Sequence, residues 1–272
     1  MIRSAHVLTK VTPVAPRGMV VAAHRLGADV GAAVLKRGGN AVDAAVATAF
    51  AMTVVEPFMS SIAGGGTMLV HLAKRGETVA LDFNVQAPAA CHESIYPLGE
   101  GVASDLFPWR KVVGDTNIFG HRSVAIPGSV AGLCLALERY GTMELADVIA
   151  PGGALARDGF VPDWYHALTM AVHAQELAAF SETARVHLRD GHYVHRPPTL
   201  LDGDRVVQPD LARSLALLAK EGPSAFYTGA IAQAISEEMK AHGGFVTAAD
   251  LAGYQVRVHA PLTGRYRSLD VC

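Results

Sequence analysis

The chain has 272 residues, of which 50% are hydrophobic and 18% charged, and its formal net charge is −2 with the histidines neutral. This composition excludes a disordered chain, and the charge provides neither a basic face for nucleic acid nor a polybasic segment for anionic lipid. The three cysteines, Cys91, Cys134 and Cys272, are too few and too scattered for a disulfide framework. Cys134 lies within an apolar helical pattern, so we expect it to be a small core residue.

Residues 1–17 show no clear periodicity and are expected to form a loose lead-in, with one domain over residues 18–272. No continuous apolar segment of a signal peptide follows the first basic residues, and no stretch reaches the roughly 18 apolar residues of a membrane helix. We therefore expect a soluble, cytoplasmic protein with no nucleic-acid or membrane partner.

Two adjacent glycines separate the first two predicted helices. Residues 19–23 are a short apolar stretch suited to a buried strand, and helical spacing begins near Leu26. Gly38 and Gly39 end that helix, because glycine readily takes the positive φ of a helix end. Asn40 is then expected to cap a helix over 41–53, with Asp43 as the acidic partner of a capping box. That helix is apolar almost all round, which predicts burial between other elements.

A glycine loop, Gly64-Gly65-Gly66, precedes two predicted strands. Residues 67–72 and 78–83 flank a polar loop with a glycine, which predicts an antiparallel hairpin. Residues 84–122 contain three prolines and little periodicity. We expect this stretch to be irregular and to line a site or cover the surface.

From Ser123 onward the pattern is mainly helical. Pro127-Gly128-Ser129 opens a helix that ends at Gly141, Thr142 begins another, and Pro151 suits the first turn of a third. Further helices are expected at 163–179, 210–221, 224–242 and, behind the capping residues Thr247 and Asp250, at 248–253, with a polar excursion at 184–206. Residues 262–271 resemble one strand that stops at Cys272, and we interpret the chain as a piece of a longer polypeptide.

The residues taken alone do not assemble a catalytic centre, a metal site or a cofactor site. The glycine loop precedes a strand, whereas phosphate-binding loops follow one and lead into a helix. His192 and His195 have a metal-like spacing but no accompanying carboxylate motif, so they are interpreted as exposed loop histidines. Glu56 is either a functional buried carboxylate or a residue that caps a turn, and Asp82 presents the same two alternatives.

Taken together, the segments resemble the γ-glutamyltransferases and the related cephalosporin acylases. The matching pieces stand in this order in the sequence: Gly18-Met19-Val20, Leu35 to Ala45, Val55-Glu56-Pro57, Gly64-Gly65-Gly66, Asp82-Phe83 with Ala87-Pro88, Pro127 to Gly132, Tyr140 to Met143, Ala156 to Phe160, Gly222-Pro223 with Phe226-Tyr227, Gly243-Gly244, and Asp250 to Tyr254. The resemblance covers about residue 18 to the end.

The resemblance implies an α/β (α+β) fold, namely the helix-rich large-subunit part of a four-layer αββα N-terminal-nucleophile hydrolase sandwich. Such a precursor cuts itself into a large and a small subunit, and the new N-terminal threonine of the small subunit is the nucleophile. This chain matches the front part of the large subunit and has no matching cleavage motif. It is therefore expected to contain no catalytic residue, to need the small subunit as partner, and to be inactive alone.

Asn84 departs from the pattern of the family. In true γ-glutamyl enzymes an arginine follows the Asp-Phe pair and holds the α-carboxylate of the substrate, whereas here Asn84 follows Asp82-Phe83. Asn84 is thus either a contact to a different acyl group in a small-molecule amide substrate or a loop residue that has drifted from the pocket. Two alternatives remain: a genuine γ-glutamyltransferase in which Arg110 or Arg122 supplies the charge, or an inactive remnant that serves as a binding module.

Overall fold

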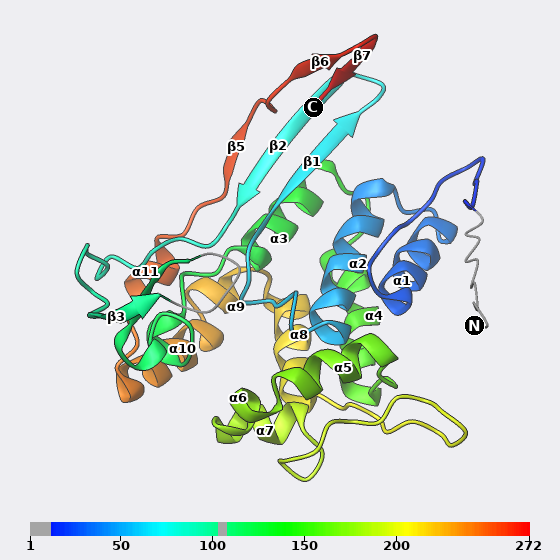
Figure 1. Cartoon of the computed structure of the whole chain (residues 1–272). Helices are drawn as coiled ribbons and strands as arrows, with labels where there is room; N and C mark the ends of the chain where they lie inside the picture. The colour runs from blue at the N-terminus through cyan, green and yellow to red at the C-terminus, as the bar shows by residue number, and fades with distance from the viewer. Residues whose placement is uncertain (1–11, 103–107) are drawn as a thin grey trace, which may run out of the picture.

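The computed structural model describes residues 12–102 and 108–272 and combines a group of helices with a small sheet that projects from them (Figure 1). The described helices are α1 (Arg25–Lys36), α2 (Ala41–Val55), α3 (Ser129–Tyr140), α4 (Leu145–Asp158), α5 (Trp164–Val172), α6 (Ala174–Ala178), α7 (Ser181–His187), α8 (Pro209–Glu221), α9 (Ser224–Tyr227), α10 (Ala230–His242) and α11 (Ala248–Ala252), with 3-10 turns η1 (Val113–Asp115) and η2 (His121–Ser123). The described strands are β1 (Gly66–Leu72), β2 (Glu77–Phe83), β3 (Leu98–Val102), β4 (Arg110–Val112), β5 (Arg257–His259), β6 (Gly264–Tyr266) and β7 (Leu269–Val271).

The capping box predicted at Asn40 is present at the start of α2. The Asn40 side chain accepts hydrogen bonds from the backbone N–H groups of Val42 and Asp43, and the Asp43 carboxylate accepts from the Asn40 N–H at 2.7 Å. Asp43 also accepts from the Thr142 N–H at 2.8 Å and from the Thr142 hydroxyl at 2.6 Å. The cap therefore joins the start of α2 to the turn between α3 and α4.

Helix α2 forms the centre of the helical layer. It packs against α1, α3 and α4, and its Val46, Phe50 and Val54 side chains are fully buried. This confirms the burial that its apolar sequence predicts, and the helix extends two residues beyond the predicted end, to Val55.

The sheet has the order β1-β2-β5, with all pairs antiparallel. The predicted hairpin is confirmed as β1 and β2, whereas β5 is a strand that the sequence did not predict. Phe83, Leu81 and Val70 lie on the face that packs against α3, and all three are buried. The opposite face carries Thr67, Leu69, Asp82, Arg257 and His259, and Leu69 there is 55% exposed. In the described part of the chain no element covers that face.

Two predictions at the start of elements were wrong. Residues 19–23 form no strand and instead lie against α1, where a Cβ on Gly31 would come within 2.8 Å of Val20 Cγ1. Pro151 lies inside α4, which begins at Leu145, and does not open a helix of its own. Residues 19–23 have an apolar pattern typical of a strand, but they pack on α1 instead. Pro151 suits a helix start, but it lies in the middle of α4, which packs on α2.

Several long predicted elements are divided in the structure. The helix expected at 163–179 is broken at His173 into α5 and α6, and that at 224–242 is broken at Gly229 into α9 and α10. The strand expected at 262–271 is a hairpin, β6 and β7, because Arg267 turns the chain with a φ of 56°. The irregular stretch 84–122 contains a short hairpin, β3 and β4.

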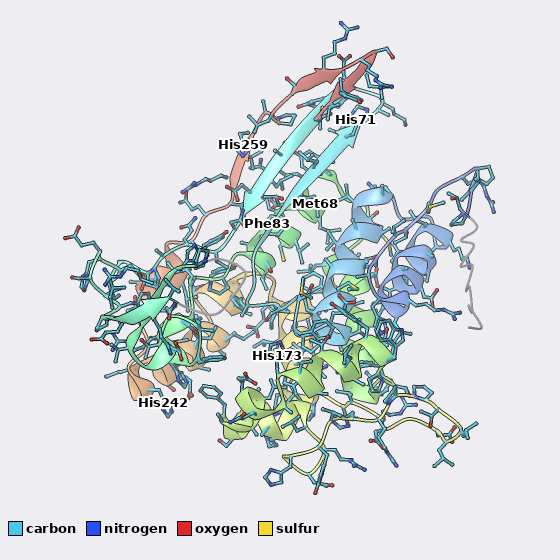
Figure 2. The ribbon with its side chains drawn as sticks, in the orientation of Figure 1. Met68, His71, Phe83, His173, His242 and His259 are labelled. Carbon is cyan, nitrogen blue, oxygen red and sulfur yellow. The ribbon has the colours of Figure 1, made fainter. Side chains whose placement is uncertain are left out.

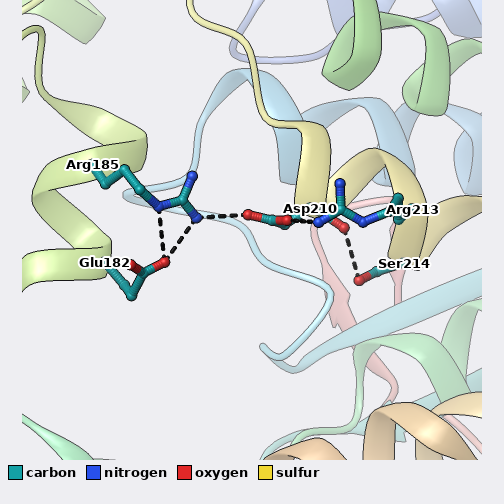
Figure 3. Close-up of polar contacts among 5 residues, drawn as sticks. All are labelled: Glu182, Arg185, Asp210, Arg213 and Ser214. Carbon is teal, nitrogen blue, oxygen red and sulfur yellow. Dashed lines mark hydrogen bonds and ion pairs between the residues drawn. The ribbon is translucent and has the colours of Figure 1, made fainter.

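A chain of charged contacts joins α7 to α8 (Figure 3). The Arg185 guanidinium donates to Glu182 at 2.8 Å on its own helix and to Asp210 at 2.6 Å on α8. Asp210 also contacts Arg213, and its carbonyl accepts from the Ser214 hydroxyl at 3.1 Å. These contacts connect α7 to α8 at the surface, and each contributes little stability because its side chains are exposed.

Cys134 is 8% exposed, which confirms its prediction as a core residue, and burial raises the pKa of its thiol to about 12.

A helix long and apolar enough to span a bilayer does not occur between residues 12 and 102 or between 108 and 272.

Candidate functional site

The turn after β2 brings Asn84 back onto Asp82. The Asn84 backbone N–H and its side-chain Nδ2 donate to the same carboxylate oxygen of Asp82, at 3.1 and 3.0 Å. These two hydrogen bonds stabilise the ionised carboxylate and hold the pKa of Asp82 below its ordinary value. Among the described residues, the second side-chain N–H of Asn84 and its amide oxygen have no hydrogen-bond partner.

The glycine loop supports this turn from behind. A Cβ on Gly65 would lie 2.6 Å from the Val85 backbone nitrogen and 2.9 Å from the Phe83 carbonyl oxygen, so only glycine allows the two backbones to approach. The Gly64 carbonyl accepts from the N–H groups of Gly128 and Ser129, at 2.8 and 3.0 Å. Gly64-Gly65-Gly66 therefore allows β1, the turn after β2 and the start of α3 to pack closely through their backbones.

Two tyrosines complete the support. The Tyr254 hydroxyl donates to the Asn84 carbonyl at 2.9 Å, and the Tyr227 hydroxyl donates to the Pro127 carbonyl at 3.0 Å. Their rings stack with centroids 5.6 Å apart. Burial raises the pKa of both phenols, that of Tyr254 to about 12, so both remain neutral donors at physiological pH. Motif segments that are far apart in the sequence thus converge on the backbone of Asn84.

A polar depression of about 390 Å³ opens at this turn and is lined by Asp82, Asn84, Val85, Gln86, Ala87 and Arg257. Arg257 pairs with Asp82 across the β2 and β5 strands, so the two side chains stand on the same face of the sheet. The described residues offer no hydrogen bond or ion pair to the Arg257 guanidinium. In the described part of the chain, the depression therefore presents the Arg257 guanidinium, the Asp82 carboxylate and the amides of Asn84 and Gln86 to solvent.

Neither arginine named from the sequence reaches this depression. The Arg122 guanidinium donates to the Ile95 carbonyl at 3.2 Å and lies 4.7 Å from the centre of the Phe245 ring. Arg110 is an exposed residue of β4 and does not line the depression. Arg257 was missed because β5 was missed, although the alternation Val256-Arg257-Val258-His259 is a usable strand signal.

The other residues considered in the sequence lie outside this depression. Glu56 is the C-cap residue of α2 and is 5% exposed, and burial raises the pKa of its carboxyl. Its backbone carbonyl accepts from Met59 and Ser60, as expected of a residue that caps a turn. His192 is exposed, as predicted, but His195 is half-buried, and burial lowers its pKa. Ser129 is the first residue of α3, as predicted for a helix start.

Comparison with known proteins links these segments to a single family. The family model described as Gamma-glutamyltranspeptidase matches residues 27–272. The chain is 40% identical over 255 residues to the acylase ACY 1 proenzyme of Pseudomonas sp. (strain SE83), covering 94% of this chain and 44% of that protein. It is 36% identical over 258 residues to the glutathione hydrolase proenzyme of Escherichia coli (strain K12), covering 94% and 42%. The chain thus spans less than half the length of these relatives.

Solved structures agree with this likeness. The γ-glutamyltranspeptidase of Helicobacter pylori superposes with a TM-score of 0.85 at 33% identity, covering 96% of this chain and 70% of that one. The cephalosporin acylase from Bacillus halodurans has a TM-score of 0.74 at 24% identity, covering 96% and 48%, and shares the fold. These likenesses confirm the predicted fold class, the helix-rich part of an N-terminal-nucleophile hydrolase sandwich.

Proposed function

Because this chain belongs to the γ-glutamyltranspeptidase family, we propose that it is the large-subunit region of an N-terminal-nucleophile amidohydrolase that is made as a self-cleaving precursor. In this proposal the nucleophile is the N-terminal threonine of the small subunit, whose α-amino group serves as base, and this chain alone is inactive. Two observations support it. The relatives above are named proenzymes, and one face of the β1-β2-β5 sheet is available to a second sheet.

The substrate we propose is a small amide whose acyl group is not γ-glutamyl. The observation that carries this is Asn84, a neutral amide at the turn on which the motif segments converge, with one N–H held by Asp82. An amide can donate to a substrate carboxylate, but it provides neither the charge nor the bidentate fork of an arginine. The acylase relative at 40% identity is consistent with such a substrate.

A second candidate function is genuine γ-glutamyl transfer or hydrolysis, and Arg257 favours it. This guanidinium lines the same depression as Asn84 and forms no ion pair within 4.0 Å among the described residues, although its charge helps to lower the pKa of Asp82. It could replace the charge that the Asp-Phe-Asn sequence lacks. Asp82 opposes this role, because its carboxylate lies on the same face and would repel a substrate carboxylate.

The test is to express the full-length protein that contains this chain and to follow self-cleavage by intact mass. Hydrolysis of simple acyl amides is then compared with that of a γ-glutamyl anilide. We expect cleavage, turnover of acyl amides and poor γ-glutamyl turnover. Asn84→Arg should raise γ-glutamyl turnover at the expense of acyl amides, because it supplies a bidentate cation at the turn.

Arg257→Gln distinguishes the two candidates, with Arg265→Gln on the exposed strand β6 as the matched control. A drop of about tenfold or more in γ-glutamyl kcat/KM in Arg257→Gln alone would favour the second candidate. Robust γ-glutamyl turnover by the unmodified enzyme would refute the Asn84 argument. If the full-length protein neither cleaves itself nor turns over either substrate, the enzyme proposal fails and a binding role remains.

A further inference from the structure

Three side chains with metal-binding chemistry meet where η2 lies against the end of α10. His121 Nε2 is 2.9 Å from Glu238 Oε1, and His242 Nε2 is 3.4 Å from the same oxygen. The donor atoms of the three residues all lie within 4.8 Å of one another. The two imidazole rings are stacked, with centroids 4.5 Å apart. Figure 2 shows His242 at the C-terminal end of α10, far from His71 and His259 on the sheet.

We propose that His121, Glu238 and His242 form a binding site for a divalent transition-metal ion of the zinc type, which links η2 to α10. Imidazole nitrogen and carboxylate oxygen are ligands that Zn²⁺ accepts at about 2.0–2.2 Å, which places neighbouring tetrahedral ligands about 3.3 Å apart. The separations of 2.9 and 3.4 Å are close to that spacing. The two imidazoles would have to rotate out of their stacked arrangement to direct both nitrogens at one ion, with water in the open position.

The position of His121 is fixed by packing that involves no ion. A Cβ on Gly244 would lie 2.9 Å from the His121 carbonyl oxygen, so glycine is required for η2 to approach the end of α10. The Tyr96 hydroxyl donates to the Arg122 carbonyl at 2.7 Å, and the Arg122 guanidinium lies over the Phe245 ring. These contacts fix the η2 backbone that carries His121, so metal binding would cost mainly the side-chain freedom of the ligands.

The electrostatics of the helix end favour a cation. Glu238 and His242 are one turn apart at the C-terminus of α10, where the last carbonyl groups give a partial negative charge. The side chains of His121, Glu238 and His242 are 28%, 57% and 54% exposed, so an ion can enter from solvent. As a plain ion pair the cluster would contribute little at this exposure. A metal would instead close a link between segments 117 residues apart in sequence.

The test is calorimetric titration of the EDTA-stripped full-length protein, without a histidine tag, with Zn²⁺. We expect His121→Asn and His242→Gln each to weaken one binding event by about tenfold or more, since even outer-sphere changes cost that much. Glu238→Gln should weaken the same event. His173→Asn, an exposed histidine after α5, is the matched control and should bind as the unmodified protein does. Zn²⁺ should also raise the unfolding temperature of the unmodified protein but not of His242→Gln.

Unchanged zinc stoichiometry and affinity in the ligand variants would overturn the proposal. Anomalous diffraction at the zinc edge from soaked crystals of the unmodified protein provides a readout that does not depend on any variant folding. An ion between His121 and His242 would support the site, and the absence of zinc there would refute it.

Discussion

Asp43 is the buried residue on which the start of α2 depends most. Its side chain is fully buried, and burial alone would raise its pKa, but the hydrogen bonds from Thr142, Asn40 and Met143 outweigh that effect and lower it. Asp43→Asn replaces a carboxylate oxygen by an NH2 group that faces N–H donors. We expect it to lower the free energy of unfolding by about 3 kcal/mol or more, measured by urea denaturation.

The control for Asp43 is Asp29→Asn on α1, an exposed residue that pairs with Arg25 at 3.4 Å. It should change the stability by no more than about 0.5 kcal/mol. Equal effects of the two substitutions would show that the capping box is not the determinant. The lowered pKa also fixes the pH dependence: the stability from Asp43 is present above the pKa of an unfolded aspartate, about 3.9, and is lost as the pH falls through its folded pKa.

How far the sequence predicts a residue's role depends on how local its partners are. The contact between Asn40 and Asp43 spans three positions, and the capping pattern predicted it. The contacts of Asp43 with Thr142 and of Asn84 with Tyr254 span 99 and 170 positions, and no local pattern indicates them. The same holds at the proposed metal site, where Glu238 and His242 have readable helical spacing but His121 does not.

At the scale of elements, two adjacent glycines in α4 allow the effect of helix propensity on stability to be distinguished from the effect of packing. A Cβ on Gly153 would meet nothing within 4 Å, whereas one on Gly152 would lie 3.2 Å from the α2 backbone at Phe50 and Ala51. Gly153→Ala should stabilise the protein by about 0.5–1 kcal/mol through helix propensity. Gly152→Ala should lose that gain and be the less stable of the two by about 1–2 kcal/mol, because the backbone opposite cannot retreat. Thermal unfolding of the two variants compares them directly, and equal stabilisation would refute close contact between α2 and α4.

A group of histidines between α5, α7 and the segment after α7 makes the stability depend on pH. Burial, together with the nearby His166 and His195, lowers the pKa of His187 to about 4, and burial also lowers the pKa values of His166 and His195. An unfolded histidine titrates near 6.5, so between about pH 6.5 and 4 the unfolded chain binds more protons than the folded one. The stability should therefore fall as the pH is lowered through this range.

His187→Asn should flatten this fall, because it removes a titration worth at most about 3 kcal/mol. The measurement is the free energy of unfolding at several pH values between 8 and 4, for which His173→Asn serves as the exposed control. A slope that is the same in His187→Asn as in the unmodified protein would contradict the assignment of the pH dependence to His187.

Elements were predictable where they are local and long. The β1 and β2 hairpin follows from two strand-like segments that flank a short polar loop with a glycine, and α2 follows from its apolar sequence and its cap. Strand β5 has three exposed residues and gains its identity only from pairing with Ala80 to Asp82. The splitting of predicted helices at His173 and Gly229 likewise reflects tertiary packing, which periodicity alone does not contain.

At the scale of the whole molecule, the face of the sheet that carries Leu69 is the place where a second sheet is expected to pack, if the proposed function holds. A leucine that is 55% exposed on the edge strand of this face should become buried in the full-length protein. Leu69→Glu would then place a charge in the interface and leave the core behind the sheet intact, because the buried side chains Phe83 and Leu81 lie on the other face. We expect a loss of self-cleaved, active product, measured by intact mass and amide turnover. Val172→Glu, a 66% exposed residue of α5, is the matched control and should process normally. Equal processing of both variants would mean that the Leu69 face stays open to water and that a second sheet does not pack there.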